Sequence, residues 1–239
     1  MGIVKKSYYI CGVYFVVLVG VILLANILSR AVTVASENAA KNVCHNVVID
    51  AGHGGVDGGA TSCSGVLESA VNLEIALRLD DLLHLLGVRT TMIRTTDISV
   101  YTAGETIGAK KVSDLKKRVE IVNNTTHAVL VSIHQNYFSD SRYSGAQVFY
   151  ADTTDSLALA KMMQEQFVTI LNKGSNRKVK QAKNVYLMQH INCPGVLIEC
   201  GFLSNPTEDM MLKDPKYQRK IVCVVASVLN NYLTSRNIT

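Results

Sequence analysis

The 239-residue sequence has no tryptophan, only three prolines, and no block of basic residues behind its net charge of +5. All three prolines come after residue 193, so none of them can interrupt a helix or strand earlier in the chain. A modest positive charge without a basic block supports at most a weak preference for anionic surfaces. The composition therefore gives no reason to expect a nucleic-acid partner, and the sequence contains no internal repeat or low-complexity tract.

Closely spaced cysteine pairs are also absent. Without any C-x-x-C pair, the sequence does not favour a zinc ribbon, a thioredoxin-type redox motif or a scaffold dense in disulfides. One or two disulfides stay open, because spacing does not show which cysteines would pair. The six cysteines are Cys11, Cys44, Cys63, Cys193, Cys200 and Cys223.

A long uncharged run lies near the N-terminus, at residues 8–28, with two lysines before it and one arginine after it. Its length of about twenty residues matches the hydrocarbon layer of a bilayer and exceeds the apolar core of a typical signal peptide. We therefore expect residues 1–30 to be a membrane anchor or signal-anchor, with the N-terminus in the cytoplasm. Processing near "TVAS" at residues 33–36 stays open, and a buried core helix is the less favoured alternative.

The remaining chain divides into a polar, small-residue linker at residues 31–44 and a folded domain at residues 45–239. In this domain apolar strand patterns alternate with helical ones, which is typical of an α/β fold. We predict a single domain with a mixed, mostly parallel sheet of about six strands and helices on both faces. Residues 96–111 lack periodicity and are predicted to be irregular, and Ser113 is predicted to cap the helix that follows. The predicted strands are 47–50, 88–94, 127–134, 146–150, 184–188 and 196–200, and the predicted helices are 67–87, 113–124, 156–173 and a last one from about residue 217.

Polar side chains follow or end three of the predicted strands: His53, His134 and Glu199. A fourth, Glu68, opens the first long helix, where the helix dipole favours a carboxylate. The carboxyl ends of parallel strands meet at one edge of a sheet, so we expect these groups to lie close together. Two imidazoles and a carboxylate with one position left for water are what a catalytic zinc ion requires. His53, Glu68 and His134 would be that set, although Glu74 is a rival for the carboxylate on position alone.

Glu199 is the best candidate for an acid/base group, because a carboxylate after four apolar residues is costly unless it meets a charge or a hydrogen bond. Asp50 is either a partner of a ligand histidine or a structural residue at the strand end. Arg177 either meets a substrate carboxylate through its planar guanidinium or belongs to a solvated charge run. The remaining histidines are interpreted as surface or structural residues: His45, His84, His127 and His190.

Several motifs, in order and over nearly all of residues 46–235, resemble the zinc-dependent N-acetylmuramoyl-L-alanine amidases of the amidase type 3 family. The resemblance implies an α/β sheet with helices on both sides, zinc held by His53, Glu68 and His134, and Glu199 as the catalytic glutamate. It favours Glu68 over Glu74. The motifs are "VVIDAGHGGVDGGA", "NLEIALRLDDLL", "TTMIRTTD", "DLKKRVEIVNN", "VSIHQN", "SGAQVFY" and "LIECGFLSNPTEDMML".

Within the family, the sequences of these motifs are most similar to those of amidases of spore-forming bacteria that act on the spore cortex. This implies hydrolysis of the amide between the lactyl group of N-acetylmuramic acid and L-alanine, outside the cytoplasm and facing the cortex of the developing spore. The cleavage would lead to the muramic-δ-lactam needed for germination. The expected partners are peptidoglycan and the membrane through the anchor. The sequence leaves open whether the enzyme is active alone or needs a helper protein to hold the site open.

The sequence departs from the family at Ser69 and Ala70, where a charged residue usually follows the glutamate ligand, and at Cys200, where a small or apolar residue is commoner. These departures concern substrate contacts and leave the ligand set intact. Two other classes remain as hypotheses: a peptidoglycan-binding module without turnover, and a zinc-dependent glycan deacetylase. The retained ligands count against the first, and the lack of an H-x-x-x-H pair after two aspartates counts against the second.

Overall fold

The structure is a computed structural model that describes residues 19–21, 25–26 and 45–236. The predicted anchor of residues 1–30 therefore falls almost entirely outside the described residues, and the predicted linker of residues 31–44 falls outside them completely. No helix within the described part of the chain is long and apolar enough to cross a membrane. Cys44–Arg236 form one compact unit, which is an α/β domain as the sequence predicted.

A six-stranded sheet in the order β2-β1-β3-β6-β4-β5 forms the centre of this unit. All neighbouring strands are parallel except β4 and β6, which run antiparallel, so the predicted mixed, mostly parallel sheet is confirmed. The strands are rich in β-branched residues that pack well on a pleated, buried surface. Their bounds are β1 Asn46–Ala51, β2 Arg89–Met92, β3 Ala128–Asn136, β4 Gln147–Tyr150, β5 Lys180–Gln181 and β6 Gly195–Phe202.

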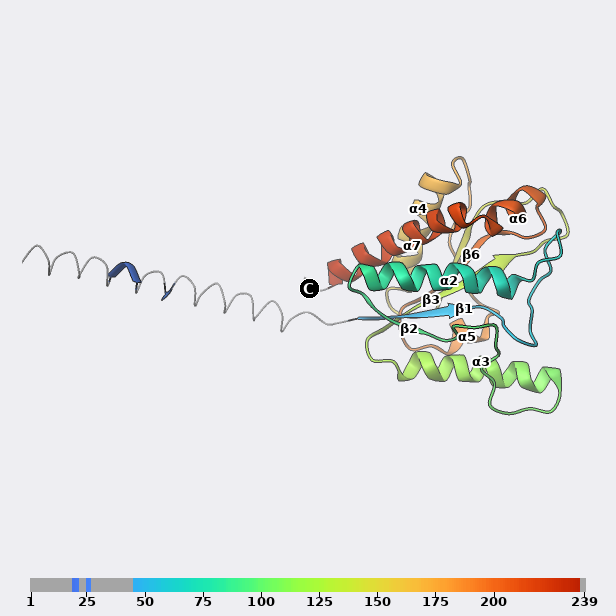
Figure 1. The fold of residues 1–239 in the computed structure, drawn as a ribbon, viewed down its shortest axis with the longest axis horizontal. Helices are drawn as coiled ribbons and strands as arrows, with labels where there is room; N and C mark the ends of the chain where they lie inside the picture. The colour runs from blue at the N-terminus through green and yellow to red at the C-terminus, as the bar shows by residue number, and fades with distance from the viewer. Residues whose placement is uncertain (1–18, 22–24, 27–44, 237–239) are drawn as a thin grey trace, which may run out of the picture. The chain divides into compact units, whose positions relative to one another are not determined.

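Helices cover both faces of the sheet, and Figure 1 shows α2 and α7 on one side of it and α3 on the other. Alternate strand residues enter two separate cores, because side chains of a strand point to opposite faces. Ile49 packs with α2, α4 and α7, whereas Val48 packs with α3 and α5. The helices are α2 Glu68–Leu85, α3 Ile107–Asn124, α4 Ser156–Gln166, the π-helical turn η1 Phe167–Leu171, α5 Tyr186–His190, α6 Pro206–Lys213 and α7 Pro215–Arg236.

One predicted strand was wrong: residues 184–188 begin a helix, α5, and the edge strand β5 lies earlier, at Lys180–Gln181. Leu187 and Met188 are buried against the α3 side of the sheet. A short apolar run fits a buried strand or a buried helix turn equally well, so periodicity could not separate the two. Helix α6 was not predicted, although the Asn205 side chain caps it by accepting from the amides of Thr207 and Glu208 at 3.0 and 3.1 Å.

Helix α3 begins at Ile107, six residues before the predicted cap at Ser113. Thr106 caps the helix instead, accepting a hydrogen bond from the Ala109 amide at 3.2 Å. The Ser113 hydroxyl accepts from the amides of Thr102 and Ala103, both at 3.1 Å. The end of the segment that was predicted to be irregular is therefore helical, and its earlier part is tied to α3 by these bonds.

The four described cysteines, at positions 63, 193, 200 and 223, are all free. The one or two disulfides left open by the sequence therefore do not form among the described residues. Cys200 is fully buried within β6, and burial raises the pKa of its thiol above its usual range. It serves as a small apolar core residue beside the candidate site.

Candidate active site

His53, Glu68 and His134 converge at the carboxyl ends of β1 and β3. Glu68 Oε2 lies 3.2 Å from His53 Nε2, and Glu68 Oε1 lies 3.0 Å from His134 Nδ1. The two imidazole rings meet edge to face, with centroids 5.0 Å apart. One ligand atom from each residue lies within 4.8 Å of the others, and this is the one such group of three found among the described residues.

The three side chains come from three different kinds of local structure. His53 follows β1 by two residues and has φ of 61°, in the left-handed region that a non-glycine residue enters only when its surroundings impose it. Glu68 is the first residue of α2. His134 lies within β3, just before a register irregularity between His134 and Asn136.

Two buried arginines hold the backbone that carries His53. Arg94 donates through Nε to the Ala51 carbonyl at 2.8 Å and through Nη2 to the Gly52 carbonyl at 3.0 Å. Arg118 donates through Nη2 to the His53 carbonyl at 2.7 Å. Three successive carbonyls thus accept from guanidinium groups, which explains how the strained conformation of His53 persists.

The guanidinium of Arg118 is itself held by the buried carboxylate of Asp50. Asp50 accepts hydrogen bonds from Arg118 Nη1 and from the Ser132 hydroxyl, the latter at 2.6 Å. Burial alone would raise the pKa of Asp50, but the Arg118 guanidinium lowers it below its usual value. The hydrogen-bond partners of Asp50 are thus Arg118 and Ser132, and neither is a ligand imidazole. Of the two roles that the sequence left open for Asp50, these contacts favour the structural one.

The Glu68 carboxylate is fixed by backbone amides as well as by the histidines. Oε2 accepts from the Ala60 amide at 3.0 Å, and Oε1 accepts from the Gln135 amide at 3.1 Å and from Asn72 Nδ2 at 3.2 Å. Burial would raise the pKa of Glu68, but hydrogen bonds and charge from His134 and His53 lower it far below its usual value. Glu68 is therefore an anion in a fixed orientation, as a metal ligand needs to be.

Asp57 adds a second carboxylate beside His53. Its Oδ2 lies 3.0 Å from His53 Nδ1 and 3.2 Å from Lys111 Nζ on α3. Burial would lower the pKa of the His53 imidazole, but its contacts with Glu68 and Asp57 raise it. Burial would likewise raise the pKa of the Asp57 carboxyl, but His53 and the charge of Lys111 lower it below its usual value. Asp57 thus restrains the ring of His53 on the side away from Glu68.

Two glycines make room for the ligands. A Cβ on Gly52 would lie 2.2 Å from His134 Nε2, so the imidazole packs directly on the backbone of residue 52. At Gly59, where φ is +69°, a Cβ would lie 2.6 Å from Glu68 Oε2 and 2.7 Å from His53 Cδ2. Any side chain at either position would displace a candidate ligand.

Glu199 lies in the same row of the sheet as His134. It pairs with His134 on β3 and with Gln147 on β4, and directly opposed residues point to the same face. Glu199 Oε2 is buried without a hydrogen-bond partner among the described residues. Burial raises the pKa of Glu199 to about 7, with His134 opposing the rise and Glu68 adding to it. A carboxyl with this pKa can both accept and release a proton near neutral pH.

The other residues considered from the sequence lie elsewhere. Glu74 accepts a hydrogen bond from Gln218 Nε2 on α7 at 2.9 Å, away from the ligand group. Arg177 reaches Gln147, next to Glu199 in the sheet. His45, His84, His127 and His190 do not join the group of three.

Sequence reasoning missed the residues that support the ligands. Asp57 had one usable signal, its place four residues after His53 in a glycine-rich turn. Asn72 also had one, its place one helical turn after Glu68. Arg94 and Arg118 had none, because the carbonyls of residues 51–53 that they hold are distant from them in the sequence.

The donor set fits a zinc ion. Zinc bonds of roughly 2.0–2.2 Å in a tetrahedron would place neighbouring ligand atoms about 3.3–3.6 Å apart. Each oxygen of Glu68 lies near a different histidine, Oε2 at 3.2 Å from His53 Nε2 and Oε1 at 3.0 Å from His134 Nδ1. One ligand atom of each residue lies within 4.8 Å of the other two, so the three side chains can reach one ion. Nitrogen and oxygen donors, two neutral and one anionic, match the ligands of catalytic zinc sites.

Comparison with known proteins gives consistent matches over the folded unit. The profile of N-acetylmuramoyl-L-alanine amidases matches residues 47–231. The germination-specific N-acetylmuramoyl-L-alanine amidase of Bacillus subtilis (strain 168) is 36% identical over 192 residues, which are 80% of this chain and 80% of that protein.

Solved structures agree. The CwlD amidase from Clostridioides difficile, in complex with the GerS lipoprotein, matches with a TM-score of 0.76 and 39% identity, over 80% of this chain and 99% of that one. An N-acetylmuramoyl-L-alanine amidase from Clostridium difficile 630 matches with a TM-score of 0.70 and 30% identity, over 80% of this chain and 98% of that one.

Proposed function

The chain belongs to the N-acetylmuramoyl-L-alanine amidase family and is an amidase of peptidoglycan, and from that premise we propose that His53, Glu68 and His134 bind zinc while Glu199 moves the protons. The bond cleaved joins the lactyl group of N-acetylmuramic acid to L-alanine of the stem peptide. The observation that carries the proposal is the row formed by His134 and Glu199 beside Glu68, at the one His/Glu group among the described residues that fits a metal ion.

The three ligands and their supports prepare the site before substrate arrives. A bound zinc ion supplies Lewis acidity there, polarising an amide carbonyl and acidifying a water molecule. Glu68 offers a carboxylate that is already anionic, with one backbone amide donating to each of its oxygens. His134 packs on Gly52, and Arg118 holds the backbone of His53, so the ligand geometry does not have to be assembled on binding.

Glu199 carries the proton transfers. It takes a proton from the attacking water as the water oxygen bonds to the carbonyl carbon. The same carboxyl then gives that proton to the alanine nitrogen as the carbon–nitrogen bond breaks. The products are a lactyl carboxylate and a peptide with a free amine. A pKa of about 7 suits both halves of this exchange at neutral pH.

Mass spectrometry of muropeptides tests the activity. The zinc-loaded protein should release intact stem peptides, and removing zinc with a chelator should stop the release. His134→Ala should retain less zinc, whereas His84→Ala, outside the ligand group, should retain as much as the parent. Binding of muropeptides without cleavage would support a binding module, and release of acetate would support a glycan deacetylase.

We also propose that the substrate is spore-cortex peptidoglycan, supported by the similarity to the germination-specific amidase of Bacillus subtilis. Removal of the stem peptide frees the lactyl group of the muramic acid, which is the requirement for closing a muramic-δ-lactam. Spores that lack the protein should contain cortex without this lactam, and zinc-site variants should fail to restore it.

Residues 1–30 are proposed to anchor the chain in the membrane, residues 31–44 to link the two parts, and residues 45–239 to form the zinc amidase domain outside the cytoplasm. The similar CwlD amidase forms a complex with the GerS lipoprotein, so we propose that a lipoprotein partner also binds this chain and helps to hold zinc. Zinc content measured with and without such a partner tests that role.

A further inference from the structure

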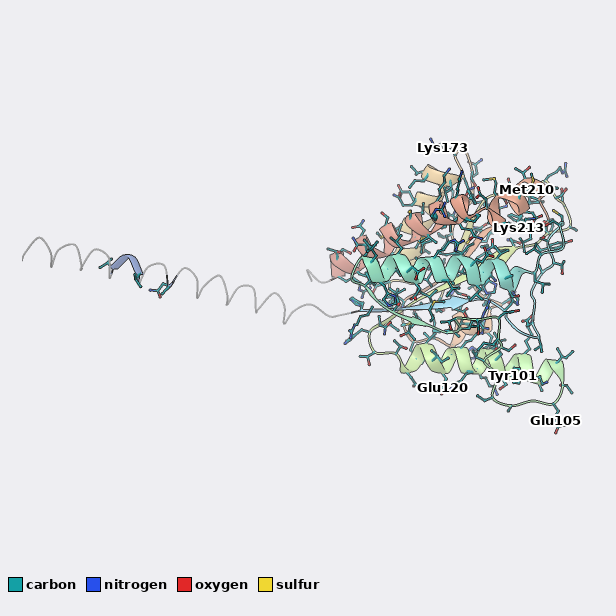
Figure 2. All side chains as sticks on the ribbon, viewed as in Figure 1. Tyr101, Glu105, Glu120, Lys173, Met210 and Lys213 are labelled. Carbon is teal, nitrogen blue, oxygen red and sulfur yellow. The ribbon has the colours of Figure 1, made fainter. Side chains whose placement is uncertain are left out.

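A wide basic groove opens beside β4 and β5, with a volume of about 730 Å³. Five of its lining side chains are basic and one is acidic: Arg142, Lys173, Arg177, Lys178, Lys180 and Glu208. Figure 2 shows Lys173 projecting outward at the edge of the folded unit. Neither the zinc ligands nor Glu199 line this groove, so its charge has no part in the site already described.

Most of the positive charge in the groove is uncompensated. Lys173, Lys178 and Lys180 are exposed and have no ion-pair partner among the described residues. Arg142 is the exception, since it pairs with Asp140 at 2.7 Å. The one acidic side chain, Glu208, accepts from the amides of Gly145 and Phe202 at 2.9 and 2.8 Å and so already has partners.

Arg177 is the fixed member of the groove. Its Nε donates to the Ser144 carbonyl at 2.8 Å, and its Nη1 donates to Gln147 Oε1 at 3.2 Å. The guanidinium also lies over the ring of Phe202, 4.7 Å from the centroid. Nη2 has no partner among the described residues. Arg177 is half-buried, and its contacts orient the guanidinium and leave one nitrogen free. Such a group can bind a carboxylate, which favours this role of Arg177 over that of a residue in a solvated charge run.

Sheet register connects the groove to the reaction centre. Gln147, which holds Arg177, is directly opposite Glu199 in the antiparallel pair of β4 and β6. His134, Glu199 and Gln147 therefore form one row on one face. Neighbouring strands are about 4.8 Å apart and an extended peptide advances about 3.3 Å per residue, so the groove lies within a few residues of the scissile bond.

We propose that this groove binds the carboxylates of the stem peptide and that Arg177 is a specificity residue for them. The inference rests on the proposed amidase site, because that site fixes where the peptide begins. Once the amide lies between the zinc ligands and Glu199, the peptide runs across β6 toward β4 and β5, and its C-terminal carboxylate and acidic side chains reach the basic groove. The N-acetylmuramic acid then lies on the side of His134 and Glu199 that faces away from the groove.

Hydrolysis of two matched substrates tests the proposal with the full, zinc-loaded chain. One substrate is N-acetylmuramoyl peptide with free carboxylates, and the other is the same compound with these carboxylates converted to amides. The parent should prefer the carboxylate form by roughly tenfold in kcat/KM, the size expected for one charge-assisted contact. Arg177→Gln should remove most of that preference by raising KM for the carboxylate form more than KM for the amidated form.

Two further variants separate charge from loop structure. Lys178→Gln combined with Lys180→Gln changes only exposed side chains, and it should weaken the preference without affecting the fold. Lys220→Gln removes the same kind of charge from an exposed position on α7 and should leave the preference at the parent value.

Binding of the free stem peptide gives a readout that does not depend on turnover. Isothermal titration of the parent with the peptide, as carboxylate and as amide, should show roughly tenfold tighter binding of the carboxylate, and Arg177→Gln should abolish the difference. Equal binding of both forms by the parent would overturn the inference, as would an unchanged preference in Arg177→Gln. If the peptide binds with the expected preference while no muropeptide is cleaved, the proposed activity is wrong and the proposed binding of carboxylates by the groove is supported.

Discussion

The guanidinium of Arg118 donates a 2.7 Å hydrogen bond to the backbone carbonyl of His53. The same side chain forms an ion pair with Asp50 on β1 and a second one with Asp114 on its own helix, the latter at 2.6 Å. A buried ion pair of the core thus holds the backbone of a candidate zinc ligand, so fold stability and ligand geometry depend on one residue.

Arg118→Leu should therefore lower both stability and zinc affinity. Removing one partner of a buried pair leaves the Asp50 carboxylate unpaired and costs about 3–5 kcal/mol of unfolding free energy. Urea denaturation and zinc titration of the same samples measure the two effects. Lys117→Gln, the adjacent residue with an exposed ion pair to Glu120 at 2.7 Å, should change either quantity by little. An Arg118 variant with parental stability would contradict the assigned role.

Asp50 should make the protein sensitive to acid. Its folded pKa is lowered below the unfolded value of about 3.9, so its contribution is present above about pH 4 and is lost as the pH falls through the folded pKa. The difference in unfolding free energy between the parent and Asp50→Asn should thus be full near pH 6 and shrink below pH 4. Denaturation of the metal-free proteins across this range measures it, and a difference that grew on acidification would have the wrong sign.

Gly52→Ala should disturb the ligand His134 specifically. A methyl group there would overlap the imidazole, so the ring must move and zinc affinity should fall by about tenfold or more. Gly108→Ala is the matched control, because no atom lies within 4 Å of the added methyl group and the site is helical. That control should keep parental zinc affinity and be neutral or slightly more stable. Equal zinc affinity in the two variants would show that the ring does not need this contact.

Asp57→Asn should weaken zinc binding by about tenfold, because the variant loses the charge that restrains His53 Nδ1. Competition with a chromogenic chelator measures the affinity. Lys111→Gln, which removes only the outer partner of Asp57, should have a smaller effect. If Lys111→Gln weakened zinc binding more than Asp57→Asn, the order of contacts proposed around His53 would be wrong.

Much of the sheet and the convergence of His53, Glu68 and His134 could be predicted, because each residue stands at the end or start of a strongly periodic element. The resemblance to the amidase family was needed to prefer Glu68 over Glu74. Arg94 and Arg118 could not be predicted, since their hydrogen bonds to carbonyls 51–53 exist only after β1 and α3 have packed. The helix at Tyr186–His190 was missed because burial of Leu187 and Met188, rather than periodicity, decides its form.

Hydrolysis by Glu199→Gln, with zinc content measured in the same sample, tests the central claim most directly. The substitution keeps the shape of the side chain and removes its capacity to take a proton. We predict parental zinc content and a loss of kcat of about 10²-fold or more, the usual contribution of a general acid/base. Unchanged release of stem peptides with zinc bound would contradict the assignment of Glu199.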